Sequence, residues 1–377
     1  MTQMPIPISL YDLTREQLIC QLAEWGEPAF RARQIWHWLY QRLAGDVDEM
    51  TDLPRPLRDR LKRTYAVGRM TVVTEQQSSD GWTRKWLFRL ADGSEIETVL
   101  MEYDGLRRTA CVSSQAGCAM DCSFCATGQM GFLRNLRAGE IVEQAIWVAR
   151  ALHTKTNGHE RLSNLVLMGM GEPFANYNNV MEAVRRLMAP ESEGGFGLGA
   201  RKITISTVGL VPGIRRFAEE TAQVNLAVSL HAATDELRDQ LVPINRRYPL
   251  RELVAATRDY LRKTNRRVSY EWALIDGVND TVEQAEALVA LVRQTNPKAG
   301  VNLVHVNMIP LNPTSGYAGH ASRRARIQQF RDVLTRANIP NTLRVRRGID
   351  IGAGCGQLKA ETAQDRTAAA LEKQTSG

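Results

Sequence analysis

The sequence predicts an α/β fold: an open, partial barrel that follows a small helical region and a β-meander. Three observations support this fold class. Residues 1–65 show helical periodicity, residues 69–101 show alternating apolar residues, and short apolar runs then alternate with helical stretches. These runs form six or seven strand–helix units, too few for a complete eight-stranded barrel, so we expect an incomplete one.

Composition narrows the class of protein further. The chain has 377 residues, 44% of them hydrophobic, which is enough for one large domain with a smaller appendage. No apolar run reaches the roughly 18 residues that span a bilayer, and the start lacks a signal-peptide pattern, so we expect a cytoplasmic protein without a membrane segment. The net charge of +7 favours an anionic partner such as nucleic acid, although a solvated basic surface has the same charge.

The first 65 residues are expected to form a helical domain. Thr14 is a suitable N-cap for the first helix, Gln17 completes a capping box, and Gly26 marks the end. A second helix is expected over "AFRARQIWHWLYQRL", with an apolar face. The residues of this face are Phe30, Ile35, Trp38 and Leu39.

A basic segment, "LPRPLRDRLKRTY", closes the helical region. Its basic residues are Arg55, Arg58, Arg60, Lys62 and Arg63. Such a segment can contact RNA phosphates, but a charge run of this length is also typical of a solvated helix face. Both interpretations stay open at this point.

The remaining chain is divided by its periodicity. Turn signals "SSDG" and "ADGS" separate three alternating runs into a meander, which we assign to a linking segment. The predicted domains are 1–65, 66–102, 103–350 for the barrel, and 351–377 for a C-terminal segment whose tail carries little apolar pattern. The expected barrel helices are Glu140–Leu152, Tyr177–Met188, Leu250–Lys263, Thr281–Val292 and Ser322–Arg336.

Three of the six cysteines, Cys118, Cys122 and Cys125, are packed into "SSQAGCAMDCSFCATGQMG". A structural zinc site needs four ligands, and only Cys111 could complete one locally. A [4Fe–4S] cluster on three thiolates instead leaves one iron open to the amino and carboxylate groups of a methionine-type cofactor. The loop follows the first barrel strand, where active sites of such barrels form, which favours the second arrangement over zinc or an electron-transfer cluster.

"CAMDCSFC" resembles the radical S-adenosylmethionine signature, C-x3-C-x-aromatic-C. The runs "TACVSSQAGCAMDCSFCATGQMGFLRNL", "LVLMGMGEPFANYNNV", "FGLGARKITISTVGLVP", "AVSLHA", "IPLNP" and "GIDIGAGCGQL" extend the likeness to the RlmN/Cfr family, which methylates adenosine carbons in RNA. The similarity covers most of the chain. It implies a (β/α)6-type radical SAM barrel, a [4Fe–4S] cluster on the three cysteines, and S-adenosyl-L-methionine (AdoMet) as cofactor.

"LMGMGEP" ends the second barrel strand. Gly169 and Gly171 would let the backbone approach a ligand, and Glu172 offers a carboxylate to an ammonium group, although a glycine turn between strand and helix is also common. Small polar residues follow the later strands at the same rim. By resemblance, the cofactor-binding residues are Gly171, Glu172, Ser206, Ser229, Leu230, His231 and Asn312.

Two further cysteines, Cys111 near the first barrel strand and Cys355 after the last, are expected over the same barrel mouth. Glycines on both sides of Cys355 suggest a mobile thiol. By resemblance these two are the catalytic pair, although an isolated buried cysteine is usually inert. Glu97 matches the proton acceptor of the family; its strand face is apolar, which would desolvate the carboxylate and make it more basic, but alone it would be a surface strand residue.

The resemblance also implies the reaction. One AdoMet methylates Cys355, and a second gives a 5′-deoxyadenosyl radical that removes hydrogen from that methyl group. The methylene radical adds to carbon 2 of adenine, Glu97 accepts the ring proton, and Cys111 attacks the Cys355 sulfur to release methyladenosine and leave a disulfide. The implied partners are 23S rRNA and tRNA, an external one-electron donor and a disulfide reductant. A carbon-8 methyltransferase of the same family, or a non-catalytic RNA-binding protein with a metal site, stays open.

Overall fold

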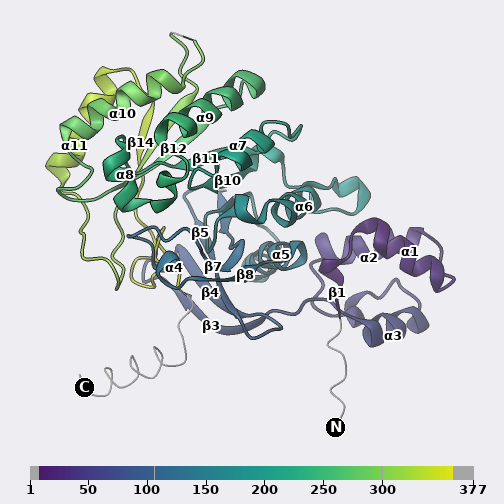
Figure 1. Cartoon of the computed structure of the whole chain (residues 1–377). Helices are drawn as coiled ribbons and strands as arrows, with labels where there is room; N and C mark the ends of the chain where they lie inside the picture. The colour runs from purple at the N-terminus through teal and green to yellow at the C-terminus, as the bar shows by residue number, and fades with distance from the viewer. Residues whose placement is uncertain (1–7, 106, 299, 360–377) are drawn as a thin grey trace, which may run out of the picture.

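The computed structural model describes residues 8–105, 107–298 and 300–359, and most of the predicted C-terminal tail therefore lies outside the described residues. Seven parallel strands of the described chain, β6 to β14 without the β7–β8 hairpin, stand in chain order within one sheet. They are β6 (Arg108–Cys111), β9 (Asn164–Leu167), β10 (Ile203–Thr207), β11 (Asn225–Ser229), β12 (Val268–Leu274), β13 (Val304–Pro310) and β14 (Asn341–Leu343). Helices connect them, as Figure 1 shows, and the predicted partial α/β barrel is confirmed.

The connecting helices agree closely with the periodicity of the sequence. They are α5 (Ala138–Lys155), α6 (Tyr177–Met188), α7 (Val211–Phe217), α8 (Asp235–Leu241), α9 (Leu250–Thr264), α10 (Val282–Thr295) and α11 (Arg324–Arg336). Helices α7 and α8 are not predicted from the sequence, because each has seven residues and thus only about two turns of periodic pattern. Short 3-10 turns occur at Leu10–Asp12, Val47–Glu49, Pro173–Asn176, Glu191–Glu193, Ala200–Lys202 and Pro243–Arg246.

The predicted meander is present as β3 (Thr71–Gln77), β4 (Thr83–Arg89) and β5 (Glu95–Glu102). It is more than a link, because β5 pairs antiparallel with β6 and the three strands extend the barrel sheet on that side. Val99 lies opposite Cys111 in this pairing. The first barrel strand therefore has the meander on one side and β9 on the other.

The N-terminal region contains α1 (Arg15–Glu24), α2 (Phe30–Tyr40) and α3 (Arg55–Thr64), tied by the short parallel pair β1 (Ile8–Ser9) and β2 (Tyr65–Ala66). The capping box of Thr14 and Gln17 is confirmed. The assignment of Phe30 to the buried face of α2 is wrong: its side chain is 56% exposed. Phe30 is five residues from the buried Ile35, which places the two about 140° apart around the helix.

The helical region is anchored on α5 and α6, beside which it lies in Figure 1. Arg150 of α5 donates from Nε to the Leu43 carbonyl at 2.7 Å, and Arg186 of α6 donates to the Tyr11 carbonyl. Glu143, buried on α5, accepts the main-chain N–H groups of residues 69 and 70 at 2.8 and 2.9 Å. Burial raises the pKa of Glu143 to about 7.

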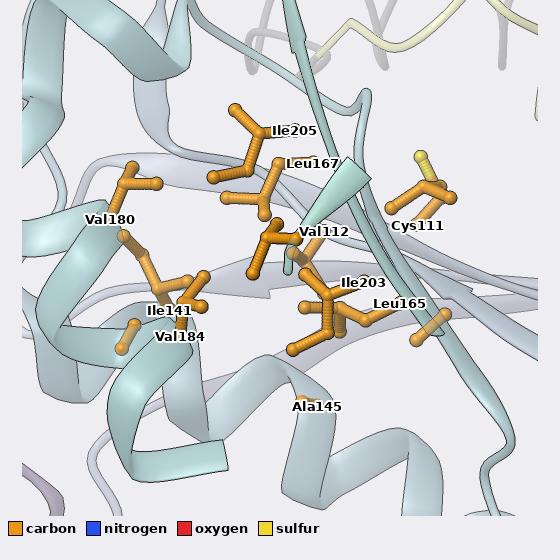
Figure 2. Packing of buried hydrophobic residues seen from close by; sticks show 14 of the residues in the cluster. Cys111, Val112, Ile141, Ala145, Leu165, Leu167, Val180, Val184, Ile203 and Ile205 are labelled. Carbon is orange, nitrogen blue, oxygen red and sulfur yellow. The ribbon is translucent and has the colours of Figure 1, made fainter. Parts of the chain in front are cut away.

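The hydrophobic core between sheet and helices is shown in Figure 2, where residues of α5 and α6 face residues of β9 and β10. Those labelled there are Ile141, Ala145, Val180 and Val184 on the helices and Val112, Leu165, Leu167, Ile203 and Ile205 on the sheet side. Cys111 points away from these helices, toward the inside of the barrel. Within the described residues, no helix has the length and apolar character needed to cross a membrane.

Candidate active site

The three clustered cysteines lie on one loop between β7 (Gln115–Gly117) and α4 (Ala126–Gln129); α4 is followed by β8 (Phe132–Asn135), which pairs with β7. The Cys118 N–H donates to the Gly131 carbonyl at 2.9 Å, and the Cys125 N–H donates to the Cys122 carbonyl at 3.0 Å. Burial raises the pKa of the Cys118 thiol to about 12 and that of Cys122 well above its usual value. These thiols therefore need a bound cation to become thiolates.

All three cysteines line one cavity at the carboxyl ends of the parallel strands, which encloses about 1030 Å³ of space not filled by atoms, open solvent at its mouth included. We call it the cofactor cavity. It brings together most of the residues that the sequence predicted for this site. They are Cys118, Cys122, Cys125, Gly171, Glu172, Ser206, Ser229, His231, Asn312 and Cys355. Leu230 does not line it, because its side chain is fully buried in the core.

Glu172 follows β9 and is buried at the wall of this cavity. Its Oε1 accepts the Phe174 N–H at 2.9 Å and its Oε2 accepts the Val208 N–H at 2.8 Å, so the carboxylate joins the ends of β9 and β10. Burial raises its pKa to about 7, while these hydrogen bonds oppose the rise. A ligand ammonium group beside it would favour the ionised form.

Gly169 and Gly171 of "LMGMGEP" line the cavity, and the structure shows a second reason for them besides the expected approach to a ligand. A Cβ on Gly171, whose φ is +98°, would lie 2.5 Å from the Gln115 Cβ, and a Cβ on Gly169 would lie 2.7 Å from the Val112 carbonyl oxygen. The residues that crowd them belong to the chain itself. The glycines thus allow the loops after β6 and β9 to pass each other, which in turn sets the position of Glu172.

Ser206 and Ser229 form a polar pair at the ends of β10 and β11, with their Oγ atoms 3.4 Å apart. His231 follows in a left-handed conformation with φ of 62°, and its Nδ1 accepts the Ala273 N–H at 3.0 Å. Burial lowers the pKa of His231 to about 3, so the ring is neutral. With Nδ1 as acceptor, Nε2 carries the proton and is available as a donor.

The segment around Cys355 is held against the cysteine loop. The Gly356 carbonyl accepts the Ala126 N–H at 2.8 Å, the Thr127 hydroxyl donates to the Leu358 carbonyl at 2.6 Å, and the Asn312 amide donates to the Cys355 carbonyl at 3.0 Å. These hydrogen bonds fix the main chain at Cys355, Gly356 and Leu358, and the expected mobility of the Cys355 thiol stays a prediction. The Cys355 residue is exposed at the boundary of two cavities, and its pKa is raised because surrounding protein atoms replace water.

Cys111 lines the second cavity, which we call the basic cavity and which Cys355 and Asn312 share with the cofactor cavity. The predicted convergence of Cys111 and Cys355 is therefore present in the structure. Burial raises the pKa of Cys111 to about 12, and the neighbouring Cys355 adds to this rise. The arginines that line the basic cavity are Arg107, Arg344, Arg346 and Arg347, and none of the acidic side chains that the structure describes lines it.

Glu97 lines neither cavity. It is 3% exposed, but the expected apolar environment is wrong: its Oε1 is 2.8 Å from the Lys85 ammonium, and its Oε2 accepts the Lys359 N–H at 2.9 Å. Lys85 also donates to the Gly352 carbonyl at 3.3 Å. The pair favours the ionised carboxylate and joins the meander to the segment that carries Cys355.

Sequence reasoning missed three charged residues of this site. Arg238 of α8 is fully buried behind the cofactor cavity, Arg344 lies near both Cys111 and Cys355, and Glu271 lines the cofactor cavity from β12. Glu271 had a readable signal, because it is a lone carboxylate inside the apolar strand run "VSYEWALI". The two arginines had none, since an arginine in a stretch with other charged residues, as in "DELRDQL" and "LRVRR", is usually exposed.

Two family models match the chain: the ribosomal RNA large subunit methyltransferase N-terminal domain over residues 8–67, and the radical SAM superfamily over residues 112–291. The probable dual-specificity RNA methyltransferase RlmN of Chloroflexus aurantiacus is 53% identical over 352 residues, which are 93% of this chain and 92% of that protein. The chain belongs to the RlmN family. Family members are radical SAM RNA methyltransferases, and this chain is one.

Other RlmN relatives and a solved structure agree with this membership. The dual-specificity RNA methyltransferase RlmN 1 of Myxococcus xanthus is 51% identical over 93% of this chain and 94% of that one. A radical SAM methyltransferase from Sphaerobacter thermophilus has a crystal structure that matches with a TM-score of 0.88 and 52% identity, over 94% of this chain and 100% of that chain. The alternative of a non-catalytic RNA-binding protein is therefore wrong.

As a radical SAM enzyme of the RlmN family, the protein uses a [4Fe–4S] cluster and AdoMet. The donor set fits both. Among the described residues, no three His, Cys, Asp or Glu side chains converge closely enough for a single metal ion, whereas thiolates of a four-iron cluster bind separate irons and stand further apart. Two buried acceptors of the cofactor cavity, Glu271 Oε2 and Asn312 Oδ1, have no hydrogen-bond partner in the described chain and so are free to receive ligand donors.

Proposed function

We propose that the protein methylates carbon 2 of an adenosine in 23S rRNA and in tRNA, through a methylated Cys355. The observation that carries the proposal is the common boundary of two cavities: Cys355 faces the cofactor cavity with the three cluster cysteines and the basic cavity with Cys111. The family model names a ribosomal RNA methyltransferase domain, and relatives are named dual-specificity RNA methyltransferases, which supports two RNA substrates.

The residues divide the work as follows. When bound, the cluster and AdoMet supply the methyl group and the one-electron chemistry that activates it. The Cys118, Cys122 and Cys125 thiolates hold the cluster, while Glu172, Ser206, Ser229, His231 and Asn312, with the backbone at Gly171 and Leu230, bind AdoMet. Cys355 carries the methyl group from the cofactor cavity to the base, a transfer its position at both cavities permits.

Release of the product requires Glu97 and Cys111. Glu97, which lies outside both cavities and is paired with Lys85, is the proposed acceptor of the proton from carbon 2 once the base is attached to the Cys355 methylene, and the unpaired electron left on the ring would return to the oxidised cluster. Cys111 then loses its proton and its thiolate attacks the Cys355 sulfur; an S–S bond forms, the S–C bond breaks, and its electron pair takes up a proton as the product methyl group. Because burial raises the pKa of Cys111 to about 12, the nearby Arg344 guanidinium is needed to stabilise the thiolate.

RNA is proposed to enter through the basic cavity. Four arginines and no carboxylate of the described chain line it, and the Arg107 and Arg347 guanidinium groups lie over the Tyr103 ring at 4.8 and 4.9 Å. Arginines beside aromatic rings suit phosphates and an unstacked base. We propose the basic helix α3 as a second RNA contact, one of the two interpretations that the sequence leaves open; Arg58 also donates to the Asp48 carbonyl, and Arg60 lies over Trp25.

The cycle needs two reductants from outside the chain: a one-electron donor for the cluster and a dithiol that reduces the Cys111–Cys355 disulfide. We propose the cytoplasm as the location, because its thiol pool keeps free cysteines reduced and can restore this pair.

The experiment compares Cys111→Ala with Cys355→Ala in the reconstituted enzyme. Cys111→Ala should accumulate protein covalently joined to RNA, seen as a nuclease-sensitive shift on a denaturing gel, because no thiolate can attack the Cys355 sulfur. Cys355→Ala should keep its iron and leave RNA unmodified and unattached. Normal turnover of Cys111→Ala, or an adduct in Cys355→Ala, would contradict the two-thiol reaction.

The carbon-8 alternative is tested on the product of the wild-type enzyme. RNA modified by the enzyme is digested to nucleosides and analysed by mass spectrometry against 2-methyladenosine and 8-methyladenosine standards. The expected product is 2-methyladenosine; 8-methyladenosine alone would refute the assignment of the carbon while leaving the two-thiol chemistry in place.

A further inference from the structure

Glu271 is a buried carboxylate with one oxygen left free in the cofactor cavity. The residue is 4% exposed on β12, and its Oε1 accepts the Asn307 amide at 2.9 Å. Its Oε2 has no hydrogen-bond partner among the described residues. Burying a carboxylate oxygen without a hydrogen-bond donor costs free energy. The simplest explanation for a carboxylate at this position is that a bound ligand supplies the donor.

The free oxygen belongs to the cofactor side of the barrel. Glu271 lines the cofactor cavity and not the basic cavity, whereas its partner Asn307 lines the basic cavity. Asn307 therefore binds Oε1 of Glu271 from the basic cavity, where RNA is proposed to enter. Oε2 is left for a ligand in the cofactor cavity. Arg344, which lies near Glu271 and Cys355, also approaches from the basic cavity.

The neighbours of Glu271 indicate which ligand group it receives. Ser229 of β11 lies directly opposite Glu271 in the sheet register, and the Ser229 and Ser206 hydroxyls are 3.4 Å apart. Two hydroxyls and a carboxylate thus form a polar row across β10, β11 and β12. Carboxylates that accept hydrogen bonds from ribose hydroxyls are a common device of nucleotide-binding sheets.

We propose that Glu271 binds the ribose diol of AdoMet, a contact that rests on the proposed placement of AdoMet in this cavity. The Glu271 carbonyl also accepts the Leu230 N–H at 3.0 Å, so the same strand position fixes the turn that carries His231. Glu271 of β12 and His231 after β11 would then lie beside the ribose and the adenine of the same AdoMet molecule. The bound diol satisfies Oε2 and fixes the ribose, and with it the carbon that joins it to the sulfonium.

The test measures binding rather than turnover. The probe is S-adenosylhomocysteine, which carries the ribose but no transferable methyl group, together with its 2′,3′-dideoxy form, both titrated calorimetrically into the anaerobically reconstituted holoenzyme. Glu271→Gln, which keeps size, should bind S-adenosylhomocysteine about 10- to 100-fold more weakly, as expected for a charged hydrogen bond. It should bind the dideoxy form as the wild type does.

The control is Ser269→Ala, two residues earlier on the same face of β12 and outside the cofactor cavity, which should bind both probes like the wild type. Equal affinity of Glu271→Gln and wild type for S-adenosylhomocysteine, or an equal loss for the dideoxy form, would overturn the proposal. A loss of RNA affinity alone would also overturn it and assign Glu271 to the target nucleoside.

Ser229→Ala separates this inference from the placement of AdoMet. If neither Ser229→Ala nor Glu271→Gln weakens S-adenosylhomocysteine binding, the placement of AdoMet itself fails. If Ser229→Ala weakens binding and Glu271→Gln does not, only the role of Glu271 fails.

Discussion

Arg238 connects the loops that carry the cofactor-binding residues, and its replacement by Met tests how much they depend on it. The guanidinium is fully buried and donates to the carbonyls of Val208, Ser229 and Leu230 at 2.7, 3.3 and 3.1 Å, and to Asn245 Oδ1 at 2.9 Å. Burial lowers its pKa to about 10, so it stays charged at neutral pH. Val208 in turn donates its N–H to Glu172.

The size of the effect follows from these contacts. Arg238→Met keeps most of the side-chain volume but removes the arginine donor from four buried acceptors, of which the Leu230 carbonyl still accepts the Ala232 N–H; each lost hydrogen bond costs about 1 kcal/mol or more. Relief from burying a charge offsets part of that loss. We expect a net destabilisation of about 3 kcal/mol, or a fall in the thermal midpoint of about 5 °C for a domain of this size.

The assay pairs calorimetric unfolding with titration of S-adenosylhomocysteine, whose affinity should fall because the Val208 and Leu230 loops lose their support. Arg238→Lys, which keeps the charge but cannot reach all four acceptors, should be intermediate. Arg258→Met, at an exposed position of α9, is the matched control and should change neither quantity. A thermal midpoint of Arg238→Met within 1 °C of wild type, with unchanged affinity, would refute the reasoning.

Three further predictions follow from other sites. Alanine at any one of the three cluster cysteines should give nearly colourless protein, because three thiolates already leave one iron of the cluster without a protein ligand; full iron content with normal AdoMet cleavage in such a variant would contradict the cluster assignment. Replacing Arg55, Arg58 and Arg60 together by alanine should weaken RNA binding and flatten its dependence on salt by up to about 0.9 per lost phosphate contact, while RNA-independent AdoMet cleavage is retained; an unchanged slope would make them a solvated face. Because the pKa of Glu143 rises from 4.5 to about 7 on folding, folded protein retains a proton that unfolded chain releases, so this residue should lower stability by on the order of 3 kcal/mol as pH rises through that window; Glu143→Gln should reduce the pH slope of the thermal midpoint between pH 5 and 8 by that part, while Glu172, whose pKa is also raised to about 7, keeps its own part, and a slope equal to that of the wild type would contradict the prediction.

Much of the fold was readable because periodicity and capping are local. Tyr177–Met188 was predicted with the bounds that α6 has, and the N-cap at Thr14 was identified from two residues. The continuation of the meander into the barrel sheet was not predicted. The alternation of apolar and polar residues predicts that β5 and β6 are strands, but it does not say which strands pair with each other.

The site could be predicted where its functional residues stand close together in the sequence. It could not be predicted where it depends on contacts between residues far apart in the sequence. The spacing of the three cysteines predicted a shared site, and the barrel rule predicted that Cys111 and Cys355 meet. The environment of Glu97 was predicted wrongly, because its strand neighbours are apolar while Lys85 and Lys359 reach it from another strand and from the C-terminal segment. Arg238 was missed because burial of a charge depends on acceptors that only the folded loops bring together.

The attachment of the Cys355 segment to the cysteine loop also bears on how the enzyme is made. Thr127 and Leu358, joined by a hydrogen bond, are separated by 231 positions, so a ribosome must translate nearly the whole chain before that contact can form. Until then the cysteine loop lacks the segment that is hydrogen-bonded to it. Delivery of iron and sulfide to a finished polypeptide, rather than to a nascent one, is therefore the order of biogenesis that this architecture favours.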